Sequence, residues 1–286
     1  MRIFGPLICG LLAVLQLSSC STQKSPPSAT IYGFRANSAE FNLGDAARFK
    51  FEPLKVTSDR QSRLVIGYAK YDRASGKKLG EFLRVSHDRG ASLGPEQTPP
   101  FVFSSGWAPL AFTKGGLAAV YASGTRAIYT PGSRERQNLF YVRSEDDGAT
   151  WSKPVQINDE QDSVAVGGGG GFSFIQRSEN EVDCVWIDRR RGFWLIFFSA
   201  SHDGGRTWTP NQAVEYDFRE GAQLAPELVM GAGGRLLAFW HDGRDRQTLF
   251  DIRGSYSDDG GQHWPASQKI NDDQEHVWQM VPEAVP

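Results

Sequence analysis

An eight-residue pattern, Ser-x-Asp-x-Gly-x-Thr-Trp, occurs four times in this chain of 286 residues. Two copies are complete, a third has His263 in place of Thr, and the first copy ends in Ser92 and Leu93. A sequence that repeats at a fixed period encodes one supersecondary unit several times, and each unit buries its apolar face against its neighbours. The intervals are 58, 57 and 56 residues, counted between Asp88, Asp146, Asp203 and Asp259.

Each repeat contains the same series of short segments that are rich in β-forming residues. In the last repeat, residues 224–230, 236–240 and 249–256 are separated by glycine-rich or polar turns, and residues 268–271 follow the Asp pattern. Segments of this composition and length predict strands. Four antiparallel strands per repeat predict the blade of a β-propeller, so the expected fold class is all-β.

The repeated pattern is that of an Asp box, also called a BNR repeat, and from about residue 49 onward the chain resembles the sialidase-type β-propellers. The resemblance implies that each box is a structural turn. Its hydroxyl residue and Asp would bond nearby amides, its Gly would adopt a positive φ, and its Trp would pack between strands. The residues that this assigns to the turns are Asp88, Asp146, Asp203, Asp259, Trp151, Trp208 and Trp264.

The number of blades follows from prolines that mark the expected first strands, at Pro53, Pro109, Pro226 and Pro282. Four repeats are complete, and a fifth begins at residues 280–283, so we expect about five blades. The last strand would pair with strand-like segments within residues 30–43 and close the ring through a composite blade, which removes exposed sheet edges. The alternative is a shortened member of the six-bladed sialidase type. The predicted propeller domain spans residues 30–286.

The N-terminus has the features of a targeting segment. Arg2 precedes an apolar stretch over residues 3–17, which is short for a membrane span, and Ser18-Ser19-Cys20 follows. This resembles a bacterial lipoprotein signal, which predicts a signal peptide over residues 1–19, lipidation of Cys20 and a flexible tether over residues 20–29. An ordinary cleaved signal peptide is the alternative. We therefore expect a protein of the bacterial cell envelope, anchored to the outer membrane by its lipid.

Composition and motifs exclude several classes of function. The net charge of −2 argues against a nucleic-acid partner. The five histidines lack metal-ligand spacing, and the chain contains neither a phosphate-binding loop nor a Gly-x-Ser-x-Gly elbow. We therefore expect no metal and no other cofactor.

The loops after the second strands lie on the face opposite the Asp boxes, because strands in a blade alternate in direction. In the family that the chain resembles, this face binds ligands. A guanidinium group pairs well with carboxylate or sulfate, so the arginines of these loops predict an acidic glycan. The alternative is that Asp188 and Asp242, each in a Trp-x-Asp-x-Arg pattern, hold their own turns through the arginine. The predicted ligand-binding residues are Arg73, Arg126, Arg190, Arg244 and Arg246.

The resemblance also implies which residues a retaining sialidase would need: an arginine triad, a Tyr–Glu pair and an Asp acid. Phe51 stands where the first arginine is expected, and Glu227 follows Pro226 where a Glu is expected to precede it. An offset of one residue turns a side chain to the other face of a strand. Only Arg244 matches its expected place. The weak catalytic candidates are Asp188, Asp242, Glu227 and Tyr216.

Together these features predict an envelope-anchored, sialidase-like propeller that binds a glycan or a protein of the cell envelope, without the full sialidase machinery. Two alternatives stay open. One is an exo-sialidase or related glycoside hydrolase that acts on acidic sugars. The other is a non-catalytic scaffold of the envelope.

Overall fold

The computed structural model describes residues 30–31, 34–35, 43–59, 61–101, 110–125, 136–166, 171–215, 221–244 and 250–272. The chain divides into two compact units, Met1–Asn42 and Leu43–Pro286. In the first unit, β1 (Thr30–Ile31) and β2 (Phe34–Arg35) form an antiparallel pair. The signal segment, the tether, Cys20 and the expected fifth first strand at residues 280–283 lie outside the described residues.

The described residues of the second unit form three antiparallel sheets, and these hold four successive groups of strands that are the predicted blades, so the all-β fold class is confirmed. In blade 1 an isolated bridge between Leu83 and Gln97 takes the place of the fourth strand. The three strands of blade 1 are β3 (Phe49–Ser58), β4 (Leu64–Asp72) and β5 (Lys78–Ser86). The four strands of blade 2 are β6 (Leu110–Phe112), β7 (Leu117–Thr125), β8 (Arg136–Ser144) and β9 (Val155–Gln156).

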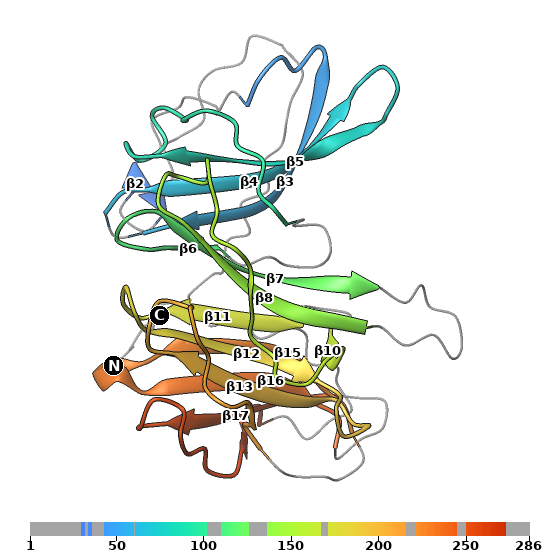
Figure 1. The fold of residues 1–286 in the computed structure, drawn as a ribbon, viewed down its shortest axis with the longest axis vertical. Coiled ribbons are helices and arrows are strands. Elements are labelled where there is room, and N and C mark those ends of the chain that lie inside the picture. The colour runs from blue at the N-terminus through green and yellow to red at the C-terminus, as the bar shows by residue number, and fades with distance from the viewer. Residues whose placement is uncertain are drawn as a thin grey trace, which may run out of the picture. The chain divides into compact units, whose positions relative to one another are not determined.

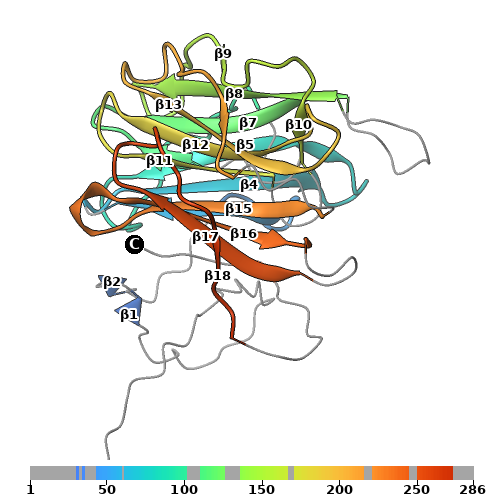
Figure 2. The same cartoon turned by 90° about the horizontal axis from the view of Figure 1, so that it is seen from below.

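Blades 3 and 4 each have four strands, and Figure 2 shows β15 to β18 side by side in chain order. A short strand, β10 (Val164–Ala165), pairs with both β8 and β12 and so joins blades 2 and 3 into one sheet. The strands of blade 3 are β11 (Phe172–Gln176), β12 (Val182–Asp188), β13 (Leu195–Ser201) and β14 (Gln212–Ala213). Those of blade 4 are β15 (Gln223–Met230), β16 (Leu236–Asp242), β17 (Asp251–Ser257) and β18 (Gln268–Lys269), with a 3-10 turn at Ala232–Gly234.

The hydrophobic core lies between the blades. The first strands contact one another in chain order, β3 with β6, β6 with β11 and β11 with β15 (Figure 1). Every residue of β12 and β13 is buried, because both faces of blade 3 are covered by neighbouring blades.

Among the residues that the structure describes, no helix is long and apolar enough to cross a bilayer.

Each Asp box forms the turn between the third and fourth strands through hydrogen bonds within the box. In blade 3 the Ser201 hydroxyl donates to Asp203 (2.8 Å) and accepts the amide of Gly205 (2.8 Å). Asp203 in turn accepts the amide (2.9 Å) and the hydroxyl (2.6 Å) of Thr207. The bonds recur in the other boxes, with Ser92 or His263 in the Thr position.

The box glycine also brings each blade against the one before it. Gly205 has φ of +82°, and a Cβ built there would come within 2.1 Å of the Tyr141 ring in β8. The box tryptophan Trp208 packs edge-on against the same ring, with centroids 5.8 Å apart. Gly261 meets Phe198 in the same way, so the box both closes its own turn and sets the spacing between blades.

Removing the box hydroxyl should destabilise the fold, because it leaves a buried amide unsatisfied. Ser144 is 2% exposed, and its hydroxyl accepts the amide of Gly148 at 2.7 Å. We expect Ser144→Ala to lower the free energy of unfolding by about 1–3 kcal/mol, measured by urea denaturation. The neighbouring Glu145→Ala is the control, since that side chain is largely exposed. Equal stability of the two variants would contradict this role.

The Asp boxes should also make stability depend on acidity. Bonds from Ser92 hold the pKa of Asp88 at about 2, and bonds from Thr207 do the same for Asp203 despite partial desolvation. An unfolded Asp has a pKa of about 3.9. Because the folded pKa is lower, the stabilisation is present above about pH 4 and is lost as the pH falls toward 2. Urea midpoints measured from pH 5 to 2 should fall, and the fall should be shallower in Asp88→Asn.

Candidate functional site

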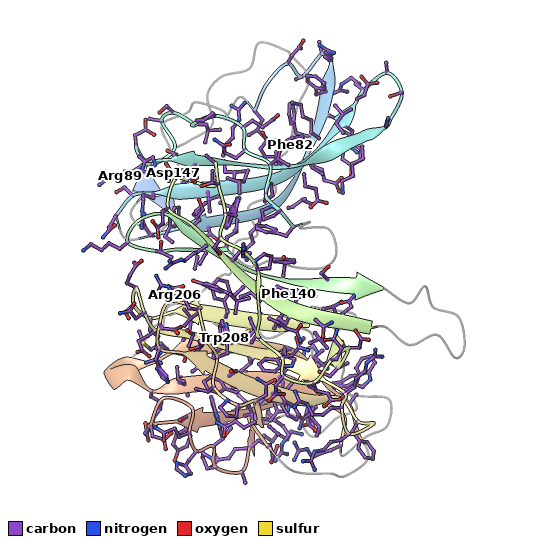
Figure 3. All side chains as sticks on the ribbon, viewed as in Figure 1. Phe82, Arg89, Phe140, Asp147, Arg206 and Trp208 are labelled. Carbon is purple, nitrogen blue, oxygen red and sulfur yellow. The ribbon has the colours of Figure 1, made fainter. Side chains whose placement is uncertain are left out.

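The two faces of the propeller carry different loops. The amide of Gly204, in a box, donates to the carbonyl of Asn180 in the turn after β11 (2.9 Å). The amide of Arg189, in the turn after β12, donates to Ser163 in the connection between blades 2 and 3 (2.9 Å). We call these the Asp-box face and the connection face. Figure 3 labels three residues along the Asp-box face: Arg89, Asp147 and Arg206.

On the connection face, Asp188 ends β12 and organises the turn that follows. It is 1% exposed and accepts hydrogen bonds from the Trp186 indole (3.1 Å) and the Ser163 hydroxyl (2.7 Å). Arg190 donates to it three times, through its amide, Nε and Nη2, each at 2.9 Å. The guanidinium of Arg190 also reaches Asp159 in the connection between blades 2 and 3 (2.6 Å).

The guanidinium group of Arg190 makes two further contacts, with Asn211 and with the Phe197 ring. Nη2 donates to Asn211 (3.1 Å), and the group lies over the Phe197 ring at 4.4 Å. Burial by itself lowers the pKa of Arg190, but the bonds to Asp188 and Asp159 outweigh it and raise the pKa overall. The cation is therefore held between two carboxylates and an aromatic face.

Blade 4 repeats this arrangement. Asp242, at the end of β16, accepts bonds from the Trp240 indole (2.7 Å) and from the amide, Nε and Nη2 of Arg244 (3.0, 2.7 and 2.6 Å). Arg244 is also paired with Glu215, which accepts the hydroxyl of Ser267 (2.6 Å). Burial raises the pKa of Asp242, yet the bonds from Arg244 and Trp240 leave it below its ordinary value.

The arginines predicted from the sequence thus do not form one cluster among the described residues. Arg190 and Arg244 belong to separate networks, and each holds the turn of its own blade to the adjoining connection. Arg73 lies in the turn after β4, where Asp72 bonds the amide and hydroxyl of Ser75 and no tryptophan takes part. Arg126, Arg246 and Tyr216 lie outside the described residues.

The turn over residues 189–194 presents groups that the sequence analysis did not single out. Gly192, with φ of +81°, donates its amide to Arg189 (2.9 Å), and Phe193 next to it is 40% exposed. Trp194 packs against the core between blades 3 and 4, and its carbonyl accepts the amide of Gln223 at the start of β15 (2.9 Å). An aromatic pair inside an arginine-rich turn was the signal that could have identified this position.

The predicted orientation of Glu227 needs a correction. The offset of one residue was expected to turn its side chain to the other face of the strand. Instead, β15 contains a β-bulge between Leu224 and Glu227 that restores one residue to the register. The Glu227 carboxylate accepts a hydrogen bond from Ser173 of β11, at 3.2 Å.

Among the described residues, no group of three or more His, Cys, Asp or Glu side chains could hold a metal ion.

The network around Arg244 should be necessary for stability. Its side chain is 3% exposed, so Arg244→Ala would leave the carboxylates of Asp242 and Glu215 buried without their cation. We expect a loss of about 3–5 kcal/mol in the free energy of unfolding. The exposed Arg73→Ala should change it by less than about 0.5 kcal/mol. A loss below about 1 kcal/mol for Arg244→Ala would contradict the structural role.

Comparison with known proteins agrees with the architecture. Residues 104–277, more than half of the chain, match a family profile described as a BNR repeat-like domain. A search of curated proteins gave no match. The solved structures that the chain resembles include an alpha-L-arabinanase and an ulvan lyase, and this likeness confirms the β-propeller fold.

Three of these structures show the extent of the likeness. The Penicillium chrysogenum alpha-L-arabinanase is 13% identical with a TM-score of 0.51, and the match covers 79% of this chain and 67% of that one. An ulvan lyase of family PL25 is 14% identical with a TM-score of 0.50, covering 79% and 59%. The NanB sialidase of Streptococcus pneumoniae is 9% identical with a TM-score of 0.44, covering 78% and 49%. The chain therefore spans about two thirds of these structures or less.

Proposed function

Because the chain belongs to the family of BNR repeat-like domains, we propose that it is an envelope-anchored propeller that binds an acidic glycan through its connection face. The observation that carries this proposal is the turn over residues 189–194. The ion pair of buried Asp188 and half-buried Arg190 holds this turn, which presents the exposed Phe193 between Arg191 and Trp194. An aromatic ring offers a flat apolar surface for a sugar ring, and arginine matches carboxylate or sulfate.

The state of the two carboxylates that recur on this face, Asp188 and Asp242, favours binding over catalysis. Asp188 and Asp242 are 1% and 3% exposed, and each is surrounded by donors from its own blade. A carboxylate that is buried and saturated with hydrogen bonds is poorly placed to exchange protons with a substrate. Phe51, where the sialidase pattern has an arginine, packs edge-on against Tyr68 with ring centroids 5.8 Å apart.

The class of ligand is consistent with the structural neighbours. Solved propellers of similar fold include an arabinanase and an ulvan lyase, which are enzymes that act on sugars. The lipoprotein signal over residues 1–19 and lipidated Cys20 belong to the same proposal. They would place the propeller at the outer membrane, where acidic polysaccharides are within reach.

A binding assay with the purified full-length protein in detergent tests this function. We expect binding of tetragalacturonate that weakens as salt is raised from 50 to 500 mM, because screening shortens the reach of the arginines. Phe193→Ala should weaken binding at least tenfold, measured by calorimetry. Tyr256→Ala is the matched control, since Tyr256 is 39% exposed and lies beside an arginine, Arg235, that pairs with Asp258 in the fourth box.

Two results would count against the proposal. One is the absence of binding to tetragalacturonate and to a broad glycan array. The other is an equal loss of binding in Phe193→Ala and Tyr256→Ala, which would show that the connection face has no special part. Hydrolysis of a fluorogenic sialoside by the purified protein would instead support the sialidase alternative, and none is expected.

A further inference from the structure

The turn that joins β4 to β5 lies on the connection face but lacks the arginine bridge of blades 3 and 4. Asp72 ends β4 as Asp188 ends β12, yet Ala74 stands two residues further on, where blade 3 has Arg190. Asp72 instead accepts the amide (2.8 Å) and the hydroxyl (2.5 Å) of Ser75. This turn is therefore held without the use of a cation.

We call residues 72–79 the basic turn, because three of them are cations, and from its second residue on every residue is exposed. Figure 1 shows the hairpin of β4 and β5 projecting from the rest of blade 1. Lys78 pairs with Glu81. In the described part of the chain, by contrast, Arg73 and Lys77 take part in no ion pair and form hydrogen bonds only through their backbone groups. Both side chains therefore keep their charge and their N–H donors for a ligand.

Two carboxylates beside the basic turn form bonds within their own loops and pair with none of its free cations. Asp72 is bonded within the turn, and Asp45 accepts two amides of the loop before β3 (2.9 and 3.4 Å). Arg48 is exposed and lies beside the turn, because its carbonyl accepts the Arg73 amide at 2.9 Å. The exposed cations Arg48, Arg73 and Lys77 therefore outnumber these two carboxylates.

The arginines of blades 3 and 4 are used in the opposite way. Arg190 and Arg244 each bond two carboxylates, one from their own turn and one from the adjoining connection. These bonds occupy donors that an acidic group would otherwise bind. In the basic turn a hydroxyl and an amide take the place of the arginine, so its cations can meet carboxylates that a ligand brings.

We propose, resting on the glycan-binding function above, that the basic turn is a second contact for an acidic polysaccharide whose chain also binds the turn over residues 189–194. Each turn follows the second strand of its blade, so both lie on the connection face. A second contact made by the same chain raises affinity without a closed pocket, because it needs no second encounter. Exposed cations also attract a polyanion at long range, and salt weakens this attraction. The expected ligand is therefore a long polyuronate and not a short acidic oligosaccharide.

Calorimetry with two probes tests this contact: tetragalacturonate, and a polygalacturonate of about twenty residues, long enough to reach a second site. The wild-type protein should bind the long chain at least tenfold more tightly. Arg73→Ala combined with Lys77→Ala should weaken binding of the long chain at least fivefold and make it less sensitive to salt. The same variant should bind tetragalacturonate within twofold of the wild type.

The matched control removes the same amount of charge from the other face. Lys114 follows β6 and Lys153 follows the second box, so both lie on the Asp-box face, and both are exposed. Lys114→Ala combined with Lys153→Ala should bind both probes as the wild type does. An equal loss of long-chain binding in the two double variants would show a general attraction by charge and would overturn the inference.

The other outcomes separate this inference from the function on which it rests. If Phe193→Ala loses tetragalacturonate but the variant of Arg73 and Lys77 binds the long chain as the wild type does, the second contact is wrong and the glycan-binding face stands. If the wild-type protein binds neither probe, both fail. Thermal midpoints should match that of the wild type, and a strong fall in the variant of Arg73 and Lys77 would show that these cations hold the fold and are not free for a ligand.

Discussion

The approach of each Asp-box glycine to the preceding blade is the contact on which this propeller depends. A glycine is required because the turn needs a positive φ and because a Cβ would overlap the side chain it meets. In blade 4, the position that corresponds to the contacted side chains Leu83, Tyr141 and Phe198 is Gly254 in β17, and the Phe239 ring lies beside it. Among the described residues, blade 4 therefore offers no side chain at this position for a further box glycine to contact. The pairs that carry it are Gly148 with Leu83, Gly205 with Tyr141 and Gly261 with Phe198.

The two faces use charge in different ways. On the Asp-box face the carboxylates bond the amides of their own turns and remain near solvent. On the connection face Asp188 and Asp242 are buried, so each needs a cation, and Arg190 and Arg244 supply it. These ion pairs hold the turns in place, and they occupy guanidinium N–H donors that a ligand would otherwise bind. In the proposed function, recognition of a glycan would then fall to the other residues of these turns, Phe193 foremost.

Much of the fold could be predicted because the repeat encodes it locally. The strands of blade 4 lie where the segments of the last repeat predicted them, within about two residues at their ends, and the described part of the chain contains no α-helix. The candidate site was predicted only in part. The sequence singled out the turns after β12 and β16, and its Trp-x-Asp-x-Arg pattern allowed two roles for the arginine, binding a ligand or holding the turn. The sequence alone could not decide between these roles, and the structure shows that Arg190 and Arg244 hold their turns. It also missed Phe193, and it misjudged Glu227 because a bulge depends on the pairing of two strands.

The sequence by itself determined the period and the turn residues, since the hydrogen bonds of a box join residues no more than four positions apart. Tertiary structure decided which guanidinium groups are neutralised and where the Glu227 carboxylate points. Arg190 meets Asp159 across 31 positions and Arg244 meets Glu215 across 29, so these partners come together only when neighbouring blades pack. Glu227 reaches Ser173 across 54 positions for the same reason.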